Sequence, residues 1–357
     1  MNTANHPFPW LGLMDRPAFC VKNGTVIAAN SAADRRMLRV GTDISEIVIE
    51  HREEYESFQN GRLYLTIKMG DLPCNASVTR TDECDIFIVH QDIDDDQLQT
   101  LALAAQQLRI PLSNVMTVSD RLLSQLNDPD DVVQQQANQI NRGLFQLLRI
   151  VSNMSDAGSY RDLHTVGMQT VDLTAMIEEI MEKAQAVSES TGITLSYTGP
   201  DAPIFSLANA EKLERAIYNL LSNALKFSPE GSTVEVKATK SGNLLSFTIC
   251  NPSIEPVEDM SFWNRYRREP AIGDTRYGLG LGMTLVSAVA SIHGGTVLID
   301  HPTLTQTRVT MTVAIAKDTS NTVRSPIIRI GDYAGGRDKA LLEFAEFLPE
   351  ESYKNIN

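Results

Sequence analysis

The chain has 357 residues, of which 42% are hydrophobic, and a formal net charge of −14 at pH 7. This length suggests two or three domains with cores of ordinary size, and the acidity argues against a nucleic-acid-binding or anionic-membrane surface. No apolar run approaches the roughly 18 residues that cross a bilayer, and the opening MNTANHPFPW lacks the basic and apolar segments of a signal peptide. We therefore expect a cytoplasmic protein without membrane insertion, whose partners are proteins or nucleotides.

The four cysteines have no metal-ligand spacing, which favours buried thiols over a metal site. They are Cys20, Cys74, Cys84 and Cys250.

Residues 1–95 predict a small α+β domain. Two β-prone runs flank the turn signal Asn23-Gly24, and further β-prone runs follow at 63–80 and 85–93. The order of strand, hairpin, short helices and antiparallel meander resembles a PAS domain, in which Asn30 would cap the helix after the second strand. Two interpretations stay open here, a ligand sensor and a domain that only pairs chains.

Residues 96–160 predict a hairpin of two helices. The first carries small or apolar residues at steps of three and four, at positions 98, 101, 105, 108, 112, 115, 119, 122 and 126. Turn residues at 127–130 break this seam, and a second one runs from Val133 to Met154. Each stripe is narrow, so two copies of the hairpin would bury their stripes best as a homodimeric four-helix bundle.

Residues 165–318 alternate helical segments, at 172–187 and 210–227, with β-prone ones, which indicates a two-layer α/β sandwich. The remaining residues, 319–357, contain a short amphipathic helix that we expect to dock onto this sandwich. The whole chain is thus predicted to be a multidomain α+β protein.

Two polar motifs of the sandwich favour a nucleotide. Asn219, Asn223 and Lys226 share one helical face in NLLSNALKF, where an amide oxygen can complete the shell of Mg²⁺ and an ammonium can meet a phosphate. About fifty residues later, GLGLG opens another helix, where glycines allow close approach of a phosphate and free N–H groups favour an anion. Each motif alone fits an ordinary solvated surface, but the combination points to a triphosphate site.

These motifs resemble the sensor histidine kinases, whose ATP-binding domain has the Bergerat-type fold shared with gyrase and the heat-shock chaperones. The segment FWNRYRREP, around Phe262 and Tyr266, matches the place of the family's mobile lid, from which Arg267, Arg268 and Arg276 could reach phosphates. The resemblance implies ATP and Mg²⁺ as ligands, with Asn223 at the metal. It implies nucleotide contacts from Asn219, Asn223, Lys226, Phe227, Asn251, Arg276, Gly278, Gly280, Leu281 and Gly282.

The phosphoacceptor motif departs from the family. Members carry H-E/D-L-R-x-P-L on the first bundle helix, whereas this chain has QQLRIPL, with Gln106 for the histidine and Gln107 for the acid. A glutamine amide nitrogen donates its lone pair into the carbonyl and is a poor nucleophile. Ile110 also replaces the threonine or asparagine that positions a hydrolytic water in many members. We therefore expect no phosphorylation of Gln106.

No other histidine is expected to replace it. His90 and His164 lie outside the middle of the bundle, and His293 stands where the family often has a structural histidine. A packed or surface role is favoured for all three.

The nucleotide pocket departs from the family as well. Asn251 replaces the aspartate that accepts the adenine amino group, and losing that charge-assisted bond would cost about 1 to 3 kcal/mol. Subfamilies with asparagine here keep nucleotide binding. Asn219 stands where hydrolytic members of the superfamily have a glutamate base, which disfavours independent ATP hydrolysis.

Three functions follow as alternatives. The favoured one is a histidine-kinase-like, degenerate two-component signalling protein, a dimeric sensor or scaffold that binds ATP and Mg²⁺ and contacts a response regulator or a partner kinase. The second is an active kinase that phosphorylates a histidine of a partner in trans. The third is a PAS-type ligand sensor.

Overall fold

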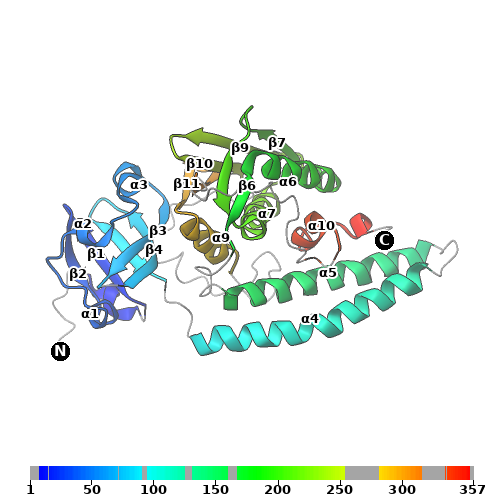
Figure 1. Ribbon diagram of the computed structural model, residues 1–357, viewed down its shortest axis with the longest axis horizontal. Helices are drawn as coiled ribbons and strands as arrows, with labels where there is room; N and C mark the ends of the chain where they lie inside the picture. The colour runs from blue at the N-terminus through cyan, green and yellow to red at the C-terminus, as the bar shows by residue number, and fades with distance from the viewer. Residues whose placement is uncertain are drawn as a thin grey trace.

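The computed structural model describes residues 8–14, 16–70, 72–90, 95–124, 131–159, 167–253, 281–315, 334 and 336–353. An N-terminal α+β domain, a hairpin of two long helices and a C-terminal α/β domain follow one another along the chain (Figure 1). Within the described residues, no helix is both long and apolar enough to cross a membrane.

The N-terminal domain is built on antiparallel strands in the spatial order β2-β1-β5-β4-β3. They are β1 (Ala18–Lys22), β2 (Thr25–Ala29), β3 (Arg62–Met69), β4 (Leu72–Arg80) and β5 (Asp85–Val89). Three short helices, α1 (Ser31–Arg35), α2 (Ile44–Ile47) and α3 (Arg52–Ser57), connect β2 to β3. A core that includes Phe19, Tyr55 and Phe87 fills one face of this sheet, and Leu11, from the 3-10 helix Pro9–Leu13, packs on a second cluster with Cys20 and Cys84.

Two local predictions for this domain are confirmed. Asn23 and Gly24 adopt φ values of 53° and 74°, as the tight turn between β1 and β2 requires. Asn30 caps α1, because its Oδ1 accepts the Ala33 N–H at 3.0 Å. The same oxygen accepts the Ala18 N–H at 3.1 Å, so the cap also ties α1 to the start of β1.

The hairpin consists of α4 (Asp95–Ser124) and α5 (Asp131–Ser159), which pack along each other. The expected apolar seam of α4 is divided between two environments. Ala105 and Met116 are buried, whereas Leu108, Val115 and Leu122 are at least half exposed. Within a single chain the predicted seam is covered only in part, because α5 lies on one side of α4.

The C-terminal domain has strands in the order β11-β12-β10-β9-β7, with α6 (Leu173–Ser188), α7 (Ala210–Phe227) and α9 (Leu281–Ile292) packed on them. The strands are β7 (Thr194–Thr198), β9 (Thr233–Ser241), β10 (Leu244–Pro252), β11 (Val297–Thr303) and β12 (Gln306–Ala314), and a separate pair is formed by β6 (Gln169–Asp172) and β8 (Phe205–Ala208). Along β9, buried and exposed side chains alternate, as one buried and one solvated face demand. The predicted two-layer arrangement of helices on a sheet is confirmed.

The N-terminal and C-terminal sheets are continuous, which the sequence did not indicate. Strand β3 pairs with β11 in antiparallel register, from Tyr64 opposite Val297 to Arg62 opposite Ile299, so that ten strands form one sheet. Gly61 precedes this joint with a φ of +88°. A Cβ atom there would lie 2.1 Å from the Ile299 carbonyl oxygen, so the approach of the two strands needs glycine at this position.

The end of the chain folds back between the hairpin and the C-terminal domain (Figure 1). It contains α10 (Lys339–Glu343) and the 3-10 helix Glu350–Tyr353. Leu342, Phe344 and Leu348 are fully buried in a cluster that also contains Met116 of α4 and Phe145 of α5. The segment packs on the sandwich, as expected, and it contacts the hairpin as well, because its apolar side chains face both.

Candidate nucleotide-binding site

Helix α7 carries the first polar motif of the candidate site. It begins after Asn209, whose Oδ1 accepts the Lys212 N–H at 2.9 Å. Leu213, Ile217 and Leu220 of its apolar face are buried in the core beneath the helix. The spacing of these residues follows the 3.6-residue period, so the sequence itself determines which face of α7 remains for polar groups.

His293 supports the start of α7. Its Nε2 accepts the Asn209 N–H at 3.0 Å, and its Nδ1 lies 2.7 Å from the Val289 carbonyl oxygen. Nδ1 therefore carries the proton that is donated to Val289. Burial lowers the pKa of His293, which keeps the ring neutral and able to accept. The predicted structural role of His293 is confirmed.

The structure brings the last glycine of the second motif against α7. A Cβ atom at Gly282, in the first turn of α9, would lie 3.0 Å from Oδ1 of Asn219. Asn219 is only 2% exposed, and its Nδ2 donates to the Arg215 carbonyl oxygen at 3.0 Å. The two motifs, distant in sequence, are thus adjacent in space. The remaining predicted contacts of the glycine motif and the lid lie outside the described residues: Phe262, Tyr266, Arg267, Arg268, Arg276, Gly278 and Gly280.

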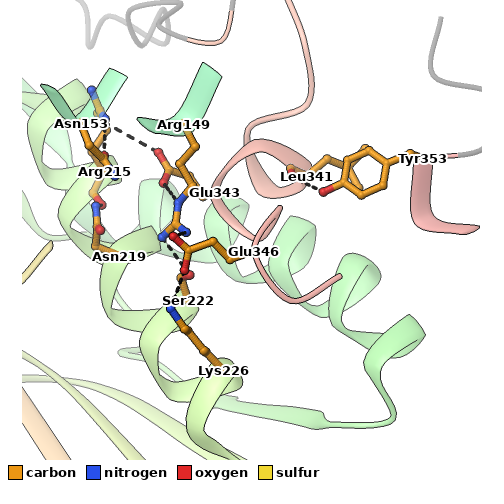
Figure 2. A network of polar contacts seen from close by, with 10 residues as sticks. All are labelled: Arg149, Asn153, Arg215, Asn219, Ser222, Lys226, Leu341, Glu343, Glu346 and Tyr353. Carbon is orange, nitrogen blue, oxygen red and sulfur yellow. Dashed lines mark hydrogen bonds and ion pairs between the residues drawn. The ribbon is translucent and has the colours of Figure 1, made fainter. Parts of the chain in front are cut away.

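The polar stripe of α7 does not face open solvent. Ser222 Oγ accepts a hydrogen bond from Nη2 of Arg149 on α5 at 3.0 Å. Nζ of Lys226 lies 2.6 Å from Oε2 of Glu346, in the segment that follows α10 (Figure 2). Asn223, the predicted metal ligand, is intermediate in exposure. The ammonium that was predicted to meet a phosphate is therefore held by a carboxylate of the same chain.

Arg149 is the centre of this network. Its Nη1 lies 2.8 Å from Oε1 of Glu346, and its Nε lies 3.4 Å from Oε2 of Glu343. Glu343 also lies 3.8 Å from Nε of Arg215, and both side chains of that pair are almost fully buried. Burial would raise the pKa of Glu346, but the nearby charges of Arg149 and Lys226 outweigh it and hold the pKa below its ordinary value.

Arg149, Glu343 and Glu346 were not predicted from the sequence. One signal was available for the arginine, because Arg149 lies four residues after Phe145 on α5 and so shares its buried face. Charged residues at such positions are buried only when they are paired. The identity of the partners could not be read from the sequence, because they lie almost two hundred residues away.

The other predicted nucleotide contacts are partly described. Asn251, on β10, is 5% exposed and donates through Nδ2 to the Pro252 carbonyl oxygen at 3.0 Å. The ring centroid of Phe227 lies 5.8 Å from Nζ of Lys226. Leu281 is described as the first residue of α9.

The position of the missing phosphoacceptor is exposed. Gln106 and Gln107 lie on the surface of α4, and Ile110 is 67% exposed one turn later. Neither α4 nor α5 contains a histidine. A phosphoryl group transferred to this hairpin would therefore find no imidazole on either helix.

His90 directly follows β5 and is a packed side chain. Its ring stacks on Tyr64, with ring centroids 5.6 Å apart and planes inclined by 19°. Burial, reinforced by the positive charges of Arg16 and Arg62, lowers the pKa of His90 to about 4. The predicted packed or surface role is confirmed for His90, whereas His164 lies outside the described residues.

The cysteines are free thiols, of which Cys20 and Cys84 are buried and Cys74 and Cys250 are partly exposed. The prediction of burial is therefore right for the first two and wrong for the others, which lie on strands with one solvated face. In the described part of the chain, no group of three or more His, Cys, Asp or Glu side chains could hold a metal ion.

Comparison with known proteins agrees with the site. Residues 208–317 match the family described as histidine kinase-, DNA gyrase B- and HSP90-like ATPase. The hybrid signal transduction histidine kinase D of Dictyostelium discoideum is 28% identical over 225 residues, covering 58% of this chain and 14% of that protein. The sensor histidine kinase CusS of Escherichia coli O6:H1 is 26% identical over 216 residues, covering 58% of this chain and 44% of that protein. The chain thus spans less than half the length of these relatives.

Among solved structures, full-length ShkA in complex with AMPPNP is similar over 64% of this chain and 47% of that one, with 20% identity and a TM-score of 0.46. The matched ATPase domain includes helix α7 and its polar motif, and the histidine kinase relatives extend the similarity to more than half of the chain. Residues 208–317 therefore form a histidine kinase-, DNA gyrase B- and HSP90-like ATPase domain, in a chain that is similar to sensor histidine kinases.

Proposed function

We propose that this protein is a two-component signalling protein that binds Mg–ATP through α7 and α9 but does not phosphorylate its own hairpin. It acts as a dimeric sensor or scaffold for a response regulator or a partner kinase. The observation that carries nucleotide binding is the close approach of Gly282 to Asn219, and the glutamine at the acceptor position of α4 carries the lack of phosphorylation.

Nucleotide binding is supported by the chemistry of the residues around this contact. Amide oxygens of Asn219 and Asn223 are hard ligands that suit Mg²⁺, which usually keeps several waters and takes the rest of its shell from phosphates. Gly282 leaves space where any side chain would press on Asn219, and the start of α9 offers backbone N–H groups to an anion. Asn223 would hold the metal, and Lys226 would balance phosphate charge once it is released from Glu346.

The scaffold role rests on Gln106. A neutral amide nitrogen cannot serve as the nucleophile that an imidazole provides, and Gln107 cannot act as the neighbouring base. The alternative of an active kinase would need a histidine on another chain, since neither hairpin helix supplies one.

Dimerisation is supported by apolar side chains that the single chain leaves exposed on the hairpin. Leu108, Val115 and Leu122 repeat every seven residues on α4, and Ile140 and Leu147 repeat in the same way on α5. Such a repeat forms a stripe along each helix, and a second copy of the hairpin covers it as a four-helix bundle.

The third function, a PAS-type ligand sensor, has one observation in its favour. A cavity of about 290 Å³ lies in the N-terminal domain between Phe8 and Trp10 on one side and residues 81–84 and Ile86 on the other. The inner face of the sheet is filled by its own apolar core. A ligand that co-purifies with the chain would favour this third function.

The nucleotide proposal is tested by thermal unfolding of the full chain with and without Mg–ATP. A nucleotide-dependent rise in Tm is expected for the natural chain, because a ligand that binds only the folded state stabilises it. Asn223→Ala should remove this rise. A rise that Asn223→Ala leaves unchanged would place the nucleotide elsewhere.

Labelling with γ-phosphate-labelled ATP tests the scaffold role. No label should enter the natural chain, whereas Gln106→His should accept label if the acceptor is the only defect. Incorporation into the natural chain itself would refute the degenerate acceptor. Lack of labelling in Gln106→His, with nucleotide binding intact, would assign a further defect to Gln107 or to the lid.

A further inference from the structure

The segment 336–353 is packed between the two parts of the protein that a kinase-like cycle would move apart. It contacts α5 on one side and α6 and α7 on the other. Phe344 stacks edge-on against Tyr218 of α7, with ring centroids 5.8 Å apart, and Tyr353 lies 5.2 Å from Phe145 of α5. The segment therefore makes an aromatic contact with α7 and another with α5.

Ion pairs join the same partners. Arg337 lies 2.6 Å from Asp120 of α4, and Lys339 lies 2.7 Å from Glu214 of α7. Beyond α10, Glu346 lies between Arg149 of the hairpin and Lys226 of α7 (Figure 2). Charged groups on all three helices thus hold the segment in one place.

Glu346 pairs with Lys226, whose ammonium the proposed nucleotide site requires for phosphate. The Lys226 side chain is only 7% exposed, and the Glu346 carboxylate lies 2.6 Å from its ammonium. A carboxylate and a phosphate oxygen compete for the same ammonium, because both are anionic acceptors. Ser222 and Arg215 on the same face are engaged by Arg149 and Asn153 of α5.

We propose that residues 336–353 form an intramolecular latch, in which Glu346 competes with the phosphates of Mg–nucleotide for Lys226 and ties the ATP-binding domain to the hairpin. The inference rests on the proposed nucleotide site. Nucleotide and latch exclude each other at Lys226, so each weakens the other by the same factor. Nucleotide binding releases the segment, and its release removes the contacts that the segment makes between the ATP-binding domain and α5. The direct hydrogen bonds of Arg149 with Ser222 and of Arg215 with Asn153 remain.

The test is a calorimetric titration of Mg–ATP into the full chain. Glu346→Gln keeps the shape of the side chain but removes its charge, and it should tighten nucleotide binding by about five- to tenfold, within the usual range of coupling between sites. Glu351→Gln is the matched control, because it removes one negative charge from an exposed position of the same segment. It should leave the affinity unchanged, and Asn223→Ala should abolish binding.

A second measurement needs no variant and remains valid even if Glu346→Gln fails to fold. Amide hydrogen exchange of residues 339–348 is followed in the natural chain, with and without saturating Mg–ATP. The latch predicts slow exchange in the free chain and faster exchange with nucleotide.

The outcomes separate the two proposals. If Glu346→Gln binds as the natural chain does, or if nucleotide leaves the exchange of residues 339–348 unchanged, the latch is overturned while the nucleotide site stands. If no chain binds, Glu346→Gln included, the nucleotide site and the latch both fall.

Discussion

The joint between the two sheets can be broken by a single methyl group. Gly61 has a φ of +88°, and a Cβ atom there would lie 2.1 Å from the Ile299 carbonyl oxygen and 3.0 Å from Cα of Asp300. Left-handed backbone costs a non-glycine residue about 1 to 2 kcal/mol. The clash is with backbone, which cannot rotate away, so the three residue pairs of β3 and β11 should also separate. If roughly three hydrogen bonds are lost at about 0.5 to 1.5 kcal/mol each, Gly61→Ala should cost about 2.5 to 6.5 kcal/mol in total, strain included.

Gly41→Ala is the matched control. Gly41 lies in the same domain with a φ of +96°, but a Cβ atom there would meet nothing within 4 Å. This variant should lose only the 1 to 2 kcal/mol of backbone strain, roughly, because no contact is disturbed.

The assay combines urea unfolding with amide hydrogen exchange of residues 62–64 and 297–299, which form the joint. Gly61→Ala should speed exchange in both segments, and Gly41→Ala should not. Equal free energies of unfolding for the two variants, with both segments still protected, would refute the reasoning that the strands meet through Gly61.

Two further predictions concern buried charge. Arg149→Ala should lower the free energy of unfolding by about 3 to 5 kcal/mol, because it leaves the buried Glu343 carboxylate without its hairpin partner. The control Arg52→Ala breaks an exposed pair with Glu56 and should lower it by less than about 0.5 kcal/mol. Similar losses for the two variants in chemical denaturation would contradict a buried network. The pKa of His90 is about 4 in the folded chain, below its ordinary value of 6.5. Between these pH values the imidazole binds a proton in the unfolded chain but not in the folded one, so the free energy of unfolding decreases as pH falls through 6.5. From pH 7.5 to 5.5, the natural chain should lose about 1 kcal/mol more than His90→Gln does, and identical pH dependence would show that His90 is protonated in the folded state.

Local structure could be predicted wherever its cause is local. The Asn23-Gly24 turn, the Asn30 cap and the helix 210–227 all depend on residues within a few positions of one another, and their boundaries agree with the structure to within a residue. The proximity of Asn219 and Gly282 was also anticipated, because the resemblance to a family supplies a fold as well as a motif.

The fate of Lys226 could not be predicted in this way. Its spacing from Asn219 and Asn223 is correct for a shared face, but spacing says nothing about what covers that face. Glu346 reaches Lys226 from 120 residues away, and Arg149 reaches Glu343 from 194 residues away. The sequence shows that each of these groups is charged and lies near apolar neighbours, but any opposite charge in the chain could be the partner.

The sequence by itself therefore determined the helices, most strands, the polar face of α7 and the absence of an imidazole from the hairpin, since propensity, periodicity and residue identity are read along the chain. Only the tertiary structure decided that β3 joins β11, that α5 covers only part of the α4 seam, and that Glu346 forms an ion pair with Lys226. These features join surfaces that are far apart in sequence. Burial and charge pairing select such contacts by their three-dimensional fit, and the chain order carries no record of that fit.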